Sequence, residues 1–278
     1  MTVLEVLQST TAYFKKRGLE SPRLNAEHLV AHSLGKKRIE LYLEFERPLS
    51  ESELVPLREL VRRRGQGEPL QHLLGTIEFG NHVFLSDKRA LIPRPETEQL
   101  VEYICDFAWP ETPRFLDVGT GSGVIILSLA SRFPKAELHA IDLSEDALAL
   151  ARENADRLGI AARVQFYRGH LLEKIEGAFD LIVANLPYVA AGEAPRLAPE
   201  VQHDPPGALY GGSAGDELIR ELIETAPTHL RPGAWLALEV GHDQAECLTR
   251  FLREKNYHDI AAKRDYAGSP RFLFAQYG

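Results

Sequence analysis

Three observations predict an α/β protein with a doubly wound, mostly parallel sheet. From about residue 91 onward, apolar segments of strand length alternate with helical patterns. A glycine-rich turn at 117–123 follows the first of these strands, and a polar turn at 185–188 follows a later one. Since the carboxyl ends of parallel strands meet at one edge of a sheet, we expect both turns to face a single ligand cleft.

Length and composition are those of a globular protein with one large domain or two ordinary ones. The chain has 278 residues, of which 44% are hydrophobic and 26% are charged. Its formal net charge of -8 argues against non-specific binding to nucleic acid, because phosphate binding needs clustered Lys and Arg. The one dense basic run, Arg62–Arg64, is predicted to lie on a solvated helix face.

The cysteine count and the hydropathy of the sequence argue against several further classes of protein. Cys105 and Cys247 are too few for a disulfide framework or a zinc site, so we expect two reduced, mostly buried thiols and no metal. No apolar stretch approaches the length of a membrane-spanning helix, and the N-terminus lacks the apolar core of a signal peptide. These features predict a cytoplasmic protein that does not enter a membrane.

The N-terminal segment predicts a small helical domain over residues 1–72, suited to binding or support. Ser50 followed by Glu53 is a capping-box pattern before the third of its helices. The three helices are indicated by apolar residues at helical spacing: Leu4, Leu7, Tyr13 and Phe14, then Ala26, Leu29, Val30 and Leu34, then Leu54, Leu57, Leu60 and Val61.

A β-hairpin linker is predicted over residues 73–90. Gly65–Pro69 ends the helical pattern, and two short alternating segments then flank the dipeptide Gly80-Asn81. Two residues of this type between strands are a hairpin signal, which gives strands at 76–79 and 82–85. The remaining residues, 91–278, form the predicted α/β domain.

Strands and helices of that domain follow from the same patterns. The Ile92–Glu98 stretch, with its prolines and acids, precedes an amphipathic helix with Leu100, Val101, Ile104 and Phe107 on one face. Helices are predicted at 124–133 and 144–158, the second with Ser144 as N-cap. Strands are predicted at 114–117, 137–142, 164–167, 179–184, 235–240 and 272–275.

The glycine turn is a candidate cofactor site. Gly119, Gly121 and Gly123 are separated by single residues, unlike the dinucleotide fingerprint, whose third glycine comes one position later. Glycine lets a ligand approach the backbone closely. Asp142 ends the next strand, where a carboxylate can accept hydrogen bonds from ribose hydroxyls. The combination predicts an adenosine-type cofactor, and the alternative is a tight turn without a ligand.

The turn Asn185-Leu186-Pro187-Tyr188 is a candidate site for a planar nitrogen. Asn185 offers one acceptor and two donors, Pro187 biases Leu186 toward an extended backbone, and Tyr188 can lie against a flat group. An amide nitrogen is a weak nucleophile, so acceptors that orient its hydrogens would accelerate methyl transfer by positioning and electrostatics. The alternative is a helix-entry turn with a buried tyrosine.

Two neighbouring segments add residues to the cleft. The long proline- and glycine-rich loop at 189–215 is predicted to form part of the substrate wall. His203 within it is interpreted as a surface residue rather than a catalytic one. His170 and Leu171 follow the strand at 164–167, where the adenine would lie, and packing is favoured there over chemistry.

With these motifs the chain resembles, over nearly its whole length, the HemK-like protein-(glutamine-N5) methyltransferases (PrmC family) that modify peptide chain release factors. Ile92–Glu98 is the most specific stretch, since a sister group acting on a ribosomal protein carries serine after the arginine. The matching segments are 90–98, 116–123, 185–188, 200–201, 211–212, 238–241 and 265–268.

The resemblance implies a Rossmann-like class I methyltransferase domain that uses S-adenosylmethionine to methylate the glutamine of a Gly-Gly-Gln motif. The N-terminal helices would help dock the release factor, and we expect a monomer. The cofactor residues it implies are Asp117, Gly119, Thr120, Gly121, Ser122, Gly123, Asp142, His170, Leu171 and Asn185. Those implied for the substrate are Arg94, Glu96, Asn185, Leu186, Pro187 and Tyr188, with Asn185, Pro187 and Tyr188 catalytic.

Two departures from the family keep an alternative open. Leu186 stands where the family usually has proline, and His170 where it tends to carry an acid. Asn-Leu-Pro-Tyr is typical of ribosomal RNA adenine dimethyltransferases, so the alternative is an adenine-N6 methyltransferase acting on ribosomal RNA or DNA. Those enzymes have their glycine turn near the N-terminus and end in a helical domain, whereas here the turn begins at Asp117 and the C-terminus predicts sheet. Glutamine methylation is favoured over this alternative and over a non-catalytic binding module.

Overall fold

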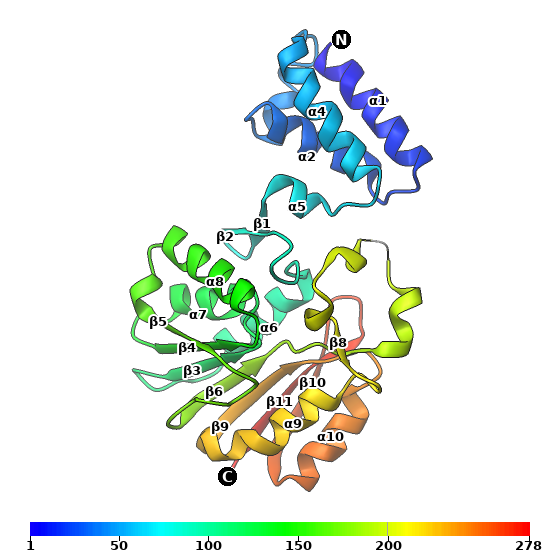
Figure 1. Ribbon diagram of the computed structural model, residues 1–278. Coiled ribbons are helices and arrows are strands. Elements are labelled where there is room, and N and C mark those ends of the chain that lie inside the picture. The colour runs from blue at the N-terminus through cyan, green and yellow to red at the C-terminus, as the bar shows by residue number, and fades with distance from the viewer. Residues whose placement is uncertain (199) are drawn as a thin grey trace. The chain divides into compact units, whose positions relative to one another are not determined.

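A computed structural model describes residues 1–198 and 200–278, and its contacts divide the chain into two compact units. One is a helical unit of residues 1–76 together with 198–203, and the other is an α/β unit of residues 77–197 and 204–278. The helical unit contains α1 (Val3–Lys16), α2 (Pro22–Ser33), α3 (Arg38–Leu41), α4 (Glu51–Arg64) and α5 (Leu70–Leu74) (Figure 1).

The helical unit is held together by an apolar core among α1, α2 and α4. Leu7 and Phe14 of α1, Leu29 of α2 and Leu57 of α4 are all buried in it. The predicted capping box of Ser50 and Glu53 is present at the start of α4. The predicted helices are confirmed, but α3 and α5 were not predicted, because four or five residues are too few to display a period of 3.6.

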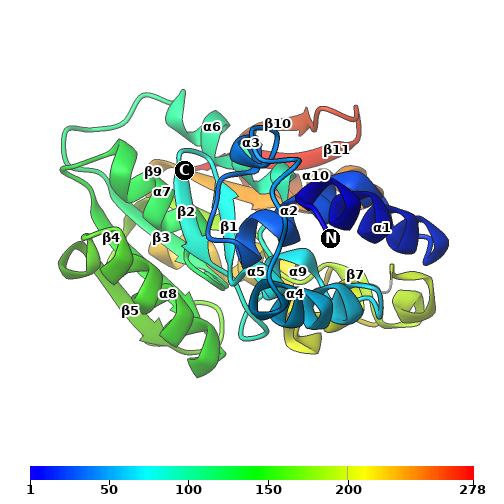
Figure 2. The same cartoon turned by 90° about the horizontal axis from the view of Figure 1, so that it is seen from above.

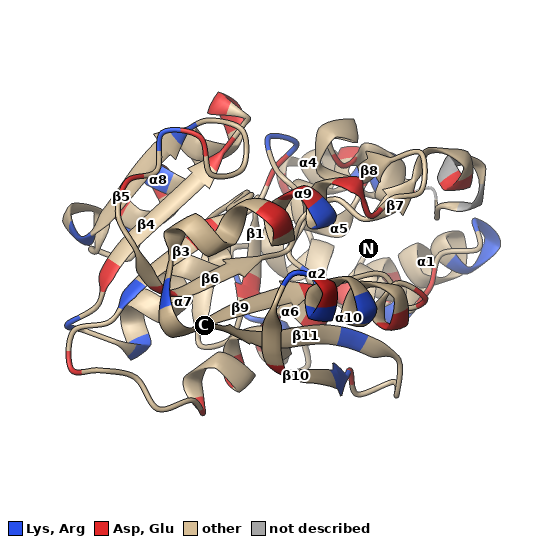
Figure 3. Ribbon diagram, turned by 90° about the horizontal axis from the view of Figure 1, so that it is seen from below, with Lys and Arg blue, Asp and Glu red and all other residues tan. Residues whose placement is uncertain are grey.

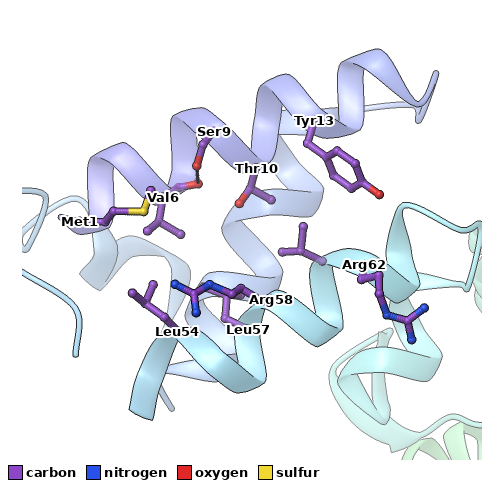
Figure 4. Close-up of a pocket in the computed structure, with 10 residues that line it drawn as sticks. Met1, Val6, Ser9, Thr10, Tyr13, Leu54, Leu57, Arg58 and Arg62 are labelled. Carbon is purple, nitrogen blue, oxygen red and sulfur yellow. Dashed lines mark hydrogen bonds between the residues drawn. The ribbon is translucent and has the colours of Figure 1, made fainter. Parts of the chain in front are cut away.

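A cavity of about 350 Å³ lies between α1 and α4 of this unit. In Figure 4 side chains from the two helices point toward one another across it, with Val6 and Leu57 on its apolar floor and Arg58 and Arg62 at its edge. Both arginines already have acidic partners, since Arg58 pairs with Glu51 and Arg62 with Glu59 at 2.6 Å.

The prediction that the basic run is a solvated helix face is wrong for Arg64. Its side chain is only 3% exposed, and its Nε donates to Asn25 Oδ1 at 2.7 Å. It also donates to the carbonyl of Glu68 at 2.9 Å and pairs with Glu200. Arg64 points inward because it lies one turn beyond Leu60 and two turns beyond Leu57, on the buried side of α4.

The α/β unit begins with the predicted hairpin, β1 (Thr76–Phe79) and β2 (His82–Leu85), and the boundary between the units falls within β1. Figure 2 shows the two strands of the hairpin side by side. Asn154 of α8 anchors the hairpin: its Oδ1 accepts from the Leu85 N–H at 2.6 Å, and its Nδ2 donates to the Leu85 carbonyl at 3.3 Å. The five helices of the unit are α6 (Pro95–Cys105), α7 (Val124–Arg132), α8 (Glu145–Arg157), α9 (Glu217–Thr225) and α10 (Ala245–Glu254).

A seven-stranded sheet runs through the α/β unit in the order β10-β11-β9-β6-β3-β4-β5. The pairs among β9, β6, β3, β4 and β5 are parallel, and β11 and β10 add antiparallel strands at one edge. The doubly wound, mostly parallel prediction is therefore confirmed. The strands are β3 (Arg114–Val118), β4 (Glu137–Asp142), β5 (Val164–Arg168), β6 (Phe179–Ala184), β9 (Leu230–Glu239), β10 (Tyr257–Arg264) and β11 (Pro270–Tyr277).

The sheet divides the core of this unit into two layers. Along β6, Leu181 and Val183 face the layer packed by α6, α7 and α8, while Ile182 and Ala184 face the layer packed by α9 and α10 (Figure 1). This alternation is the two-residue period of a strand buried on both faces. The edge strand β10 was not predicted, since it is largely exposed and its sequence carries charged residues in place of an apolar run.

The segment predicted as a loop at 189–215 contains some regular structure. Two short strands within it, β7 (Val189–Ala190) and β8 (Tyr210–Gly212), pair in parallel. Short 3-10 turns account for the other assigned residues of this segment and for two further connections: η1 (Ala161–Arg163), η2 (Ala191–Arg196), η3 (Val201–His203), η4 (Pro206–Ala208) and η5 (Ala226–His229).

Acidic and basic residues are interspersed along α9 and α10 on the face that Figure 3 shows. None of the helices within residues 1–198 and 200–278 combines the length and the apolar character that crossing a membrane requires. Across the same residues, no group of three or more His, Cys, Asp or Glu side chains is placed to hold a metal ion.

Candidate active site

A cavity of about 430 Å³ opens where β3, β4 and β6 end. This is the edge of a parallel sheet at which ligands of doubly wound proteins bind. The predicted site residues that line it are Arg94, Gly119, Thr120, Gly121, Ser122, Asp142, His170, Leu171, Asn185, Leu186 and Pro187. Four other predicted residues, Asp117, Gly123, Tyr188 and Glu96, are not among those lining it.

The glycine turn exposes backbone to this cavity. Gly119, Gly121 and Gly123 have φ angles of 72°, 57° and 83°, in the left-handed region that favours glycine. The amides of Gly119 and Thr120 donate to the Ile141 carbonyl at 2.8 and 3.1 Å, which ties the turn to the end of β4. Gly123 is the N-cap of α7 and therefore lies where the turn enters the helix.

Asp142 joins the end of β4 to this turn. Its Oδ2 accepts from the Gly121 amide and its Oδ1 from the Ser144 amide, both at 2.8 Å. Burial raises the pKa of Asp142, against the lowering effect of these hydrogen bonds. Each carboxylate oxygen still has a second lone pair that can accept from a ligand hydroxyl, so the side chain suits a ribose.

Asp117 lies behind the turn, fully buried. Its Oδ2 accepts from the Thr120 hydroxyl at 2.6 Å, while Oδ1 has no hydrogen-bond partner among the described residues. Burial raises the pKa of this carboxyl to about 7. An unpaired carboxylate oxygen beneath a glycine turn fits a cofactor that carries positive charge, as the amino and sulfonium groups of S-adenosylmethionine do.

His170 and Leu171 form part of the cavity wall after β5. His170 Nε2 lies 2.9 Å from Glu221 Oε1 on α9, so the imidazole is engaged with that helix. Leu171 is buried with a φ of 46°, an uncommon conformation for a residue other than glycine. His203, interpreted as a surface residue, is exposed and belongs to the helical unit.

Asn185 lines the cavity, and its side-chain nitrogen is hydrogen-bonded to buried side chains that follow it into the protein. Its Nδ2 donates to Thr97 Oγ1 at 3.1 Å, and Thr97 Oγ1 donates to Glu239 Oε2 at 2.8 Å. The next residue, Leu186, is 4% exposed, and its side chain packs against the glycine turn. The two predicted motifs therefore meet directly in the folded chain.

Tyr188 supports the turn from behind rather than lining the cavity. Its carbonyl accepts from Gln244 Nε2 at 3.0 Å, and the guanidinium of Arg271 lies 5.9 Å from its ring centroid. Burial, reinforced by the charge of Glu239, raises the pKa of its phenol to about 12, so the hydroxyl stays protonated.

Two glycines of the following loop, Gly211 and Gly215, pack against the backbone of this turn. A Cβ on Gly211 would lie 2.3 Å from the Pro187 carbonyl oxygen, and one on Gly215 would lie 2.5 Å from that of Tyr188. No side chain fits at either place, so glycine at these positions lets the loop approach the turn. The part of the predicted substrate wall around Gly211 and Gly215 is thus packed directly against the Asn185 turn.

Arg94 lines the cavity, and its guanidinium is paired with Asp204, a residue that the sequence analysis did not predict. Asp204, whose side chain is fully buried, accepts from Arg94 Nη2 at 2.5 Å and from the Ile92 amide at 3.1 Å. Thr97, Leu143 and Pro205 line the cavity and were also missed. Thr97 lies within the specific Ile92–Glu98 stretch, which was the one available signal for it.

Comparisons with known proteins agree with this arrangement. Residues 5–75 match the family described as PrmC N-terminal domain, and residues 111–228 match a methyltransferase domain family. The release factor glutamine methyltransferase of Geobacter sulfurreducens is 39% identical over 100% of this chain and 97% of its own length. The human MTRF1L release factor glutamine methyltransferase is 34% identical over 98% of this chain and 86% of its own length.

Solved structures show the same fold at lower identity. A ribosomal protein L11 methylase from Lactobacillus delbrueckii subsp. bulgaricus superposes with a TM-score of 0.51 at 21% identity. The match covers 72% of this chain and 95% of that one.

Proposed function

Because this chain belongs to the family of release factor glutamine methyltransferases, we propose that it methylates the side-chain amide nitrogen of the glutamine in the Gly-Gly-Gln motif of peptide chain release factors. Its methyl donor is S-adenosylmethionine, which supplies an electrophilic methyl group when bound. The observation that carries the proposal is that one cavity of about 430 Å³ is lined by both the glycine turn and Asn185.

The donor side of the cavity is assigned to the glycine turn and its two carboxylates. The open backbone at Gly119 and Gly121 accommodates close approach by the cofactor. Asp142 accepts from the ribose hydroxyls, and the unpaired oxygen of Asp117 attracts the positive charge of the methionine portion. Leu171 and His170 bound the adenine side, where His170 serves through packing while its imidazole is paired with Glu221.

The acceptor side is assigned to Asn185 and the adjoining backbone. An amide nitrogen is a weak nucleophile because its lone pair is delocalised, so the site must orient it rather than deprotonate it strongly. Asn185 Oδ1 and the Leu186 carbonyl accept one N–H each from the glutamine amide, and this directs the lone-pair axis at the methyl group. Pro187 biases Leu186 to the extended backbone that presents its carbonyl.

Further contacts to the protein substrate are proposed for Tyr188, Arg94 and Glu96. Tyr188 shapes the pocket from behind through its partly buried ring. Arg94 is half-buried at the cavity and held by Asp204, so its remaining donors are available to backbone carbonyls of the Gly-Gly-Gln loop. Glu96, in the first turn of α6, faces the same neighbourhood, where its charge acts on Tyr188 and Glu239.

The helical unit is proposed to dock the release factor, and the enzyme to act as a cytoplasmic monomer. Support for docking comes from the match of residues 5–75 to the PrmC N-terminal domain and from the cavity between α1 and α4. A net charge of -8 supports a protein rather than a nucleic-acid substrate. The cytoplasm follows from the substrate, since release factors act on ribosomes.

Mass spectrometry of a release factor incubated with the enzyme and methyl-labelled S-adenosylmethionine tests the function. The label should appear on the glutamine of the Gly-Gly-Gln loop, and a release factor with that glutamine replaced should take up none. The Asn185→Ala enzyme should turn over about a hundredfold more slowly or worse, since it loses an acceptor that acts on the reacting nitrogen. Salt-resistant methylation of adenine in RNA or DNA, with no label on a release factor, would contradict the proposal.

A further inference from the structure

Two buried polar side chains form a hydrogen-bonded chain behind Asn185: Thr97, which also lines the cavity, and Glu239. Thr97 comes from α6 and Glu239 from the last position of β9, so the two are far apart in the sequence. They are only 2% and 1% exposed. Burying a carboxyl group this completely costs free energy unless its hydrogen bonds are well made, so its place beside the reacting turn calls for a reason.

The direction of each hydrogen bond in this chain of side chains follows from the donors available. An ionised carboxylate can only accept, so the single hydroxyl hydrogen of Thr97 goes to Glu239 Oε2, 2.8 Å away. The Thr97 oxygen then has only lone pairs to offer Asn185, and it accepts from Asn185 Nδ2 at 3.1 Å. The oxygen and nitrogen of the Asn185 side-chain amide could be placed in either of two orientations. Only the one with Nδ2 toward Thr97 Oγ1 allows both hydrogen bonds.

Titratable groups from three segments face Glu239. Arg271 of β11 donates from Nη1 to the Val240 carbonyl at 3.2 Å, and its charge favours the ionised carboxylate. Glu96 of α6 acts in the opposite sense, and the Tyr188 phenol stays neutral. Burial raises the pKa of Glu239 to about 7, against the hydrogen bond from Thr97, the charge of Arg271 and a weaker hydrogen bond from Asn185 itself, which adds to the hold on the amide nitrogen.

We propose that Thr97 and Glu239 are positioning residues for methyl transfer, which hold the amide nitrogen of Asn185 inward and leave its Oδ1 for the acceptor N–H. This inference rests on the role proposed above for Asn185. An Asn185 free to flip would present its NH₂ group to the glutamine NH₂ group, donor against donor, in part of the population. We call the two hydrogen bonds, from Asn185 to Thr97 and from Thr97 to Glu239, the relay. The relay removes the flipped state, so it raises turnover without adding a hydrogen bond to either ligand.

Two substitutions at Thr97 test the relay, because one removes the hydroxyl at nearly constant volume and the other keeps it. Thr97→Val should lower kcat for release factor methylation by about 10- to 100-fold. The KM for release factor and the Kd for S-adenosylmethionine should change by less than about threefold, since the Thr97 hydroxyl bonds Asn185 and Glu239 and valine keeps the methyl group and volume at the cavity wall. Thr97→Ser should recover kcat to within about threefold of wild type, because its hydroxyl can make both hydrogen bonds.

A matched control separates the relay from loss of any buried hydroxyl. Thr249 on α10 is partly buried, and its hydroxyl donates to the Ala245 carbonyl at 2.7 Å, away from Asn185. Thr249→Val should therefore leave kcat within about twofold of wild type. Equal losses of kcat in Thr97→Val and Thr249→Val would overturn the positioning role.

The relay also predicts non-additivity. In an Asn185→Ala background the amide to be positioned is gone, so Thr97→Val should cost no further kcat in single-turnover assays. Multiplied losses in the double variant would mean that Thr97 acts by some other route. Absence of label on the release factor with wild-type enzyme would instead refute the proposed function itself, so the two failures are distinguishable.

Glu239→Gln provides a second route should Thr97→Val fail to fold. A glutamine at this position can donate to Thr97 as well as accept, so it loses the enforced direction, and kcat should fall by about 3- to 30-fold. Wild-type kcat should rise with pH as the Glu239 carboxyl ionises, and the variant should lack that rise. A variant with wild-type kcat and an unchanged pH profile would contradict the inference.

Discussion

The side chain of Leu186 packs against Gly119, so closely that a Cβ built on Gly119 would lie 2.8 Å from Leu186 Cδ2. This contact joins the acceptor turn to the cofactor turn. It also gives Leu186 a packing role, because its side chain is 4% exposed and belongs to the core layer shared with α9 and α10. Leucine in place of the family's usual proline therefore changes how the turn is anchored, while residue 186 still lines the cavity.

Gly119→Ala should weaken S-adenosylmethionine binding by at least about tenfold. The new methyl group would meet Leu186 Cδ2 at 2.8 Å, and the φ of 72° adds roughly 1–2 kcal/mol of strain for an L-residue. Relief of the clash must move the Leu186 side chain or the glycine turn, and Leu186 and Gly119 both line the cavity. Titration calorimetry with S-adenosylmethionine measures the change.

Gly159→Ala is the matched control for that experiment. Gly159 has nearly the same φ, 70°, but nothing lies within 4 Å of a Cβ built there. It should lose stability through backbone strain and keep wild-type cofactor affinity. If both variants bound the cofactor equally weakly, the contact between Gly119 and Leu186 would not be the cause.

Leu186→Pro should lower stability and leave acceptor choice unchanged. Proline has fewer carbons than leucine to fill the space beside Gly119, so about 1–3 kcal/mol of unfolding free energy should be lost. Denaturant unfolding checks this loss. The acceptor should remain the release factor glutamine, with a modest change in rate, and a switch to nucleic acid would show that Leu186 sets the substrate class.

Asp142→Ala should weaken cofactor binding about tenfold or more. The change removes the acceptor of the Gly121 and Ser144 amides as well as the one proposed for ribose, and a charge-assisted hydrogen bond contributes roughly 1.5–3 kcal/mol. Calorimetry on Asp142→Ala and on Asp146→Ala, an exposed acid in the first turn of α8, makes the comparison. Unchanged affinity in the first variant would remove Asp142 from the site.

Stability should fall as pH rises from 5 to 8. Burial raises the pKa values of Asp117 and Glu239 to about 7, above their ordinary values of 3.8 and 4.5. The folded state therefore binds more protons than the unfolded state in this range, and the contribution of each group, present below its unfolded pKa, is lost as pH rises through the folded one. Each group should account for on the order of 2 kcal/mol.

Denaturant unfolding at several pH values checks this dependence. Asp117→Asn and Glu239→Gln each remove one titrating group, so each variant should show a shallower fall in unfolding free energy than wild type between pH 5 and 8. A slope identical to that of wild type in either variant would show that the group does not titrate there.

Much of this protein was predictable from periodicity and turn chemistry, because both are local properties of the chain. The strand at 179–184, the Gly80-Asn81 hairpin and the capping residue Ser144 were all recognisable from a few consecutive residues, and the structure confirms them. The order of the parallel strands then places the ends of β3, β4 and β6 at one edge of the sheet. That is why residues as distant as Gly119 and Asn185 could be expected in one cleft.

Arg64 and Asp204 could not be interpreted correctly in this way. A run of three arginines indicates solvent exposure, yet Arg64 is buried because its partners, Asn25 and Glu200, come from distant segments. Asp204 stands in a loop without periodicity, and its link to Arg94 and Ile92 spans more than a hundred residues. Contacts of this kind depend on which segments meet in space, and no local pattern encodes that meeting.

The fold class, the cofactor turn and the acceptor turn were all predictable without coordinates, since each depends on residue type at short spacing. How the acceptor amide is held was not: Thr97 and Glu239 lie in separate motifs, and their hydrogen bonds to each other and to Asn185 exist because α6 packs beside the ends of β6 and β9. The direction of a buried hydrogen bond is set by the donors and acceptors that surround it in three dimensions, and these come together only when the chain folds.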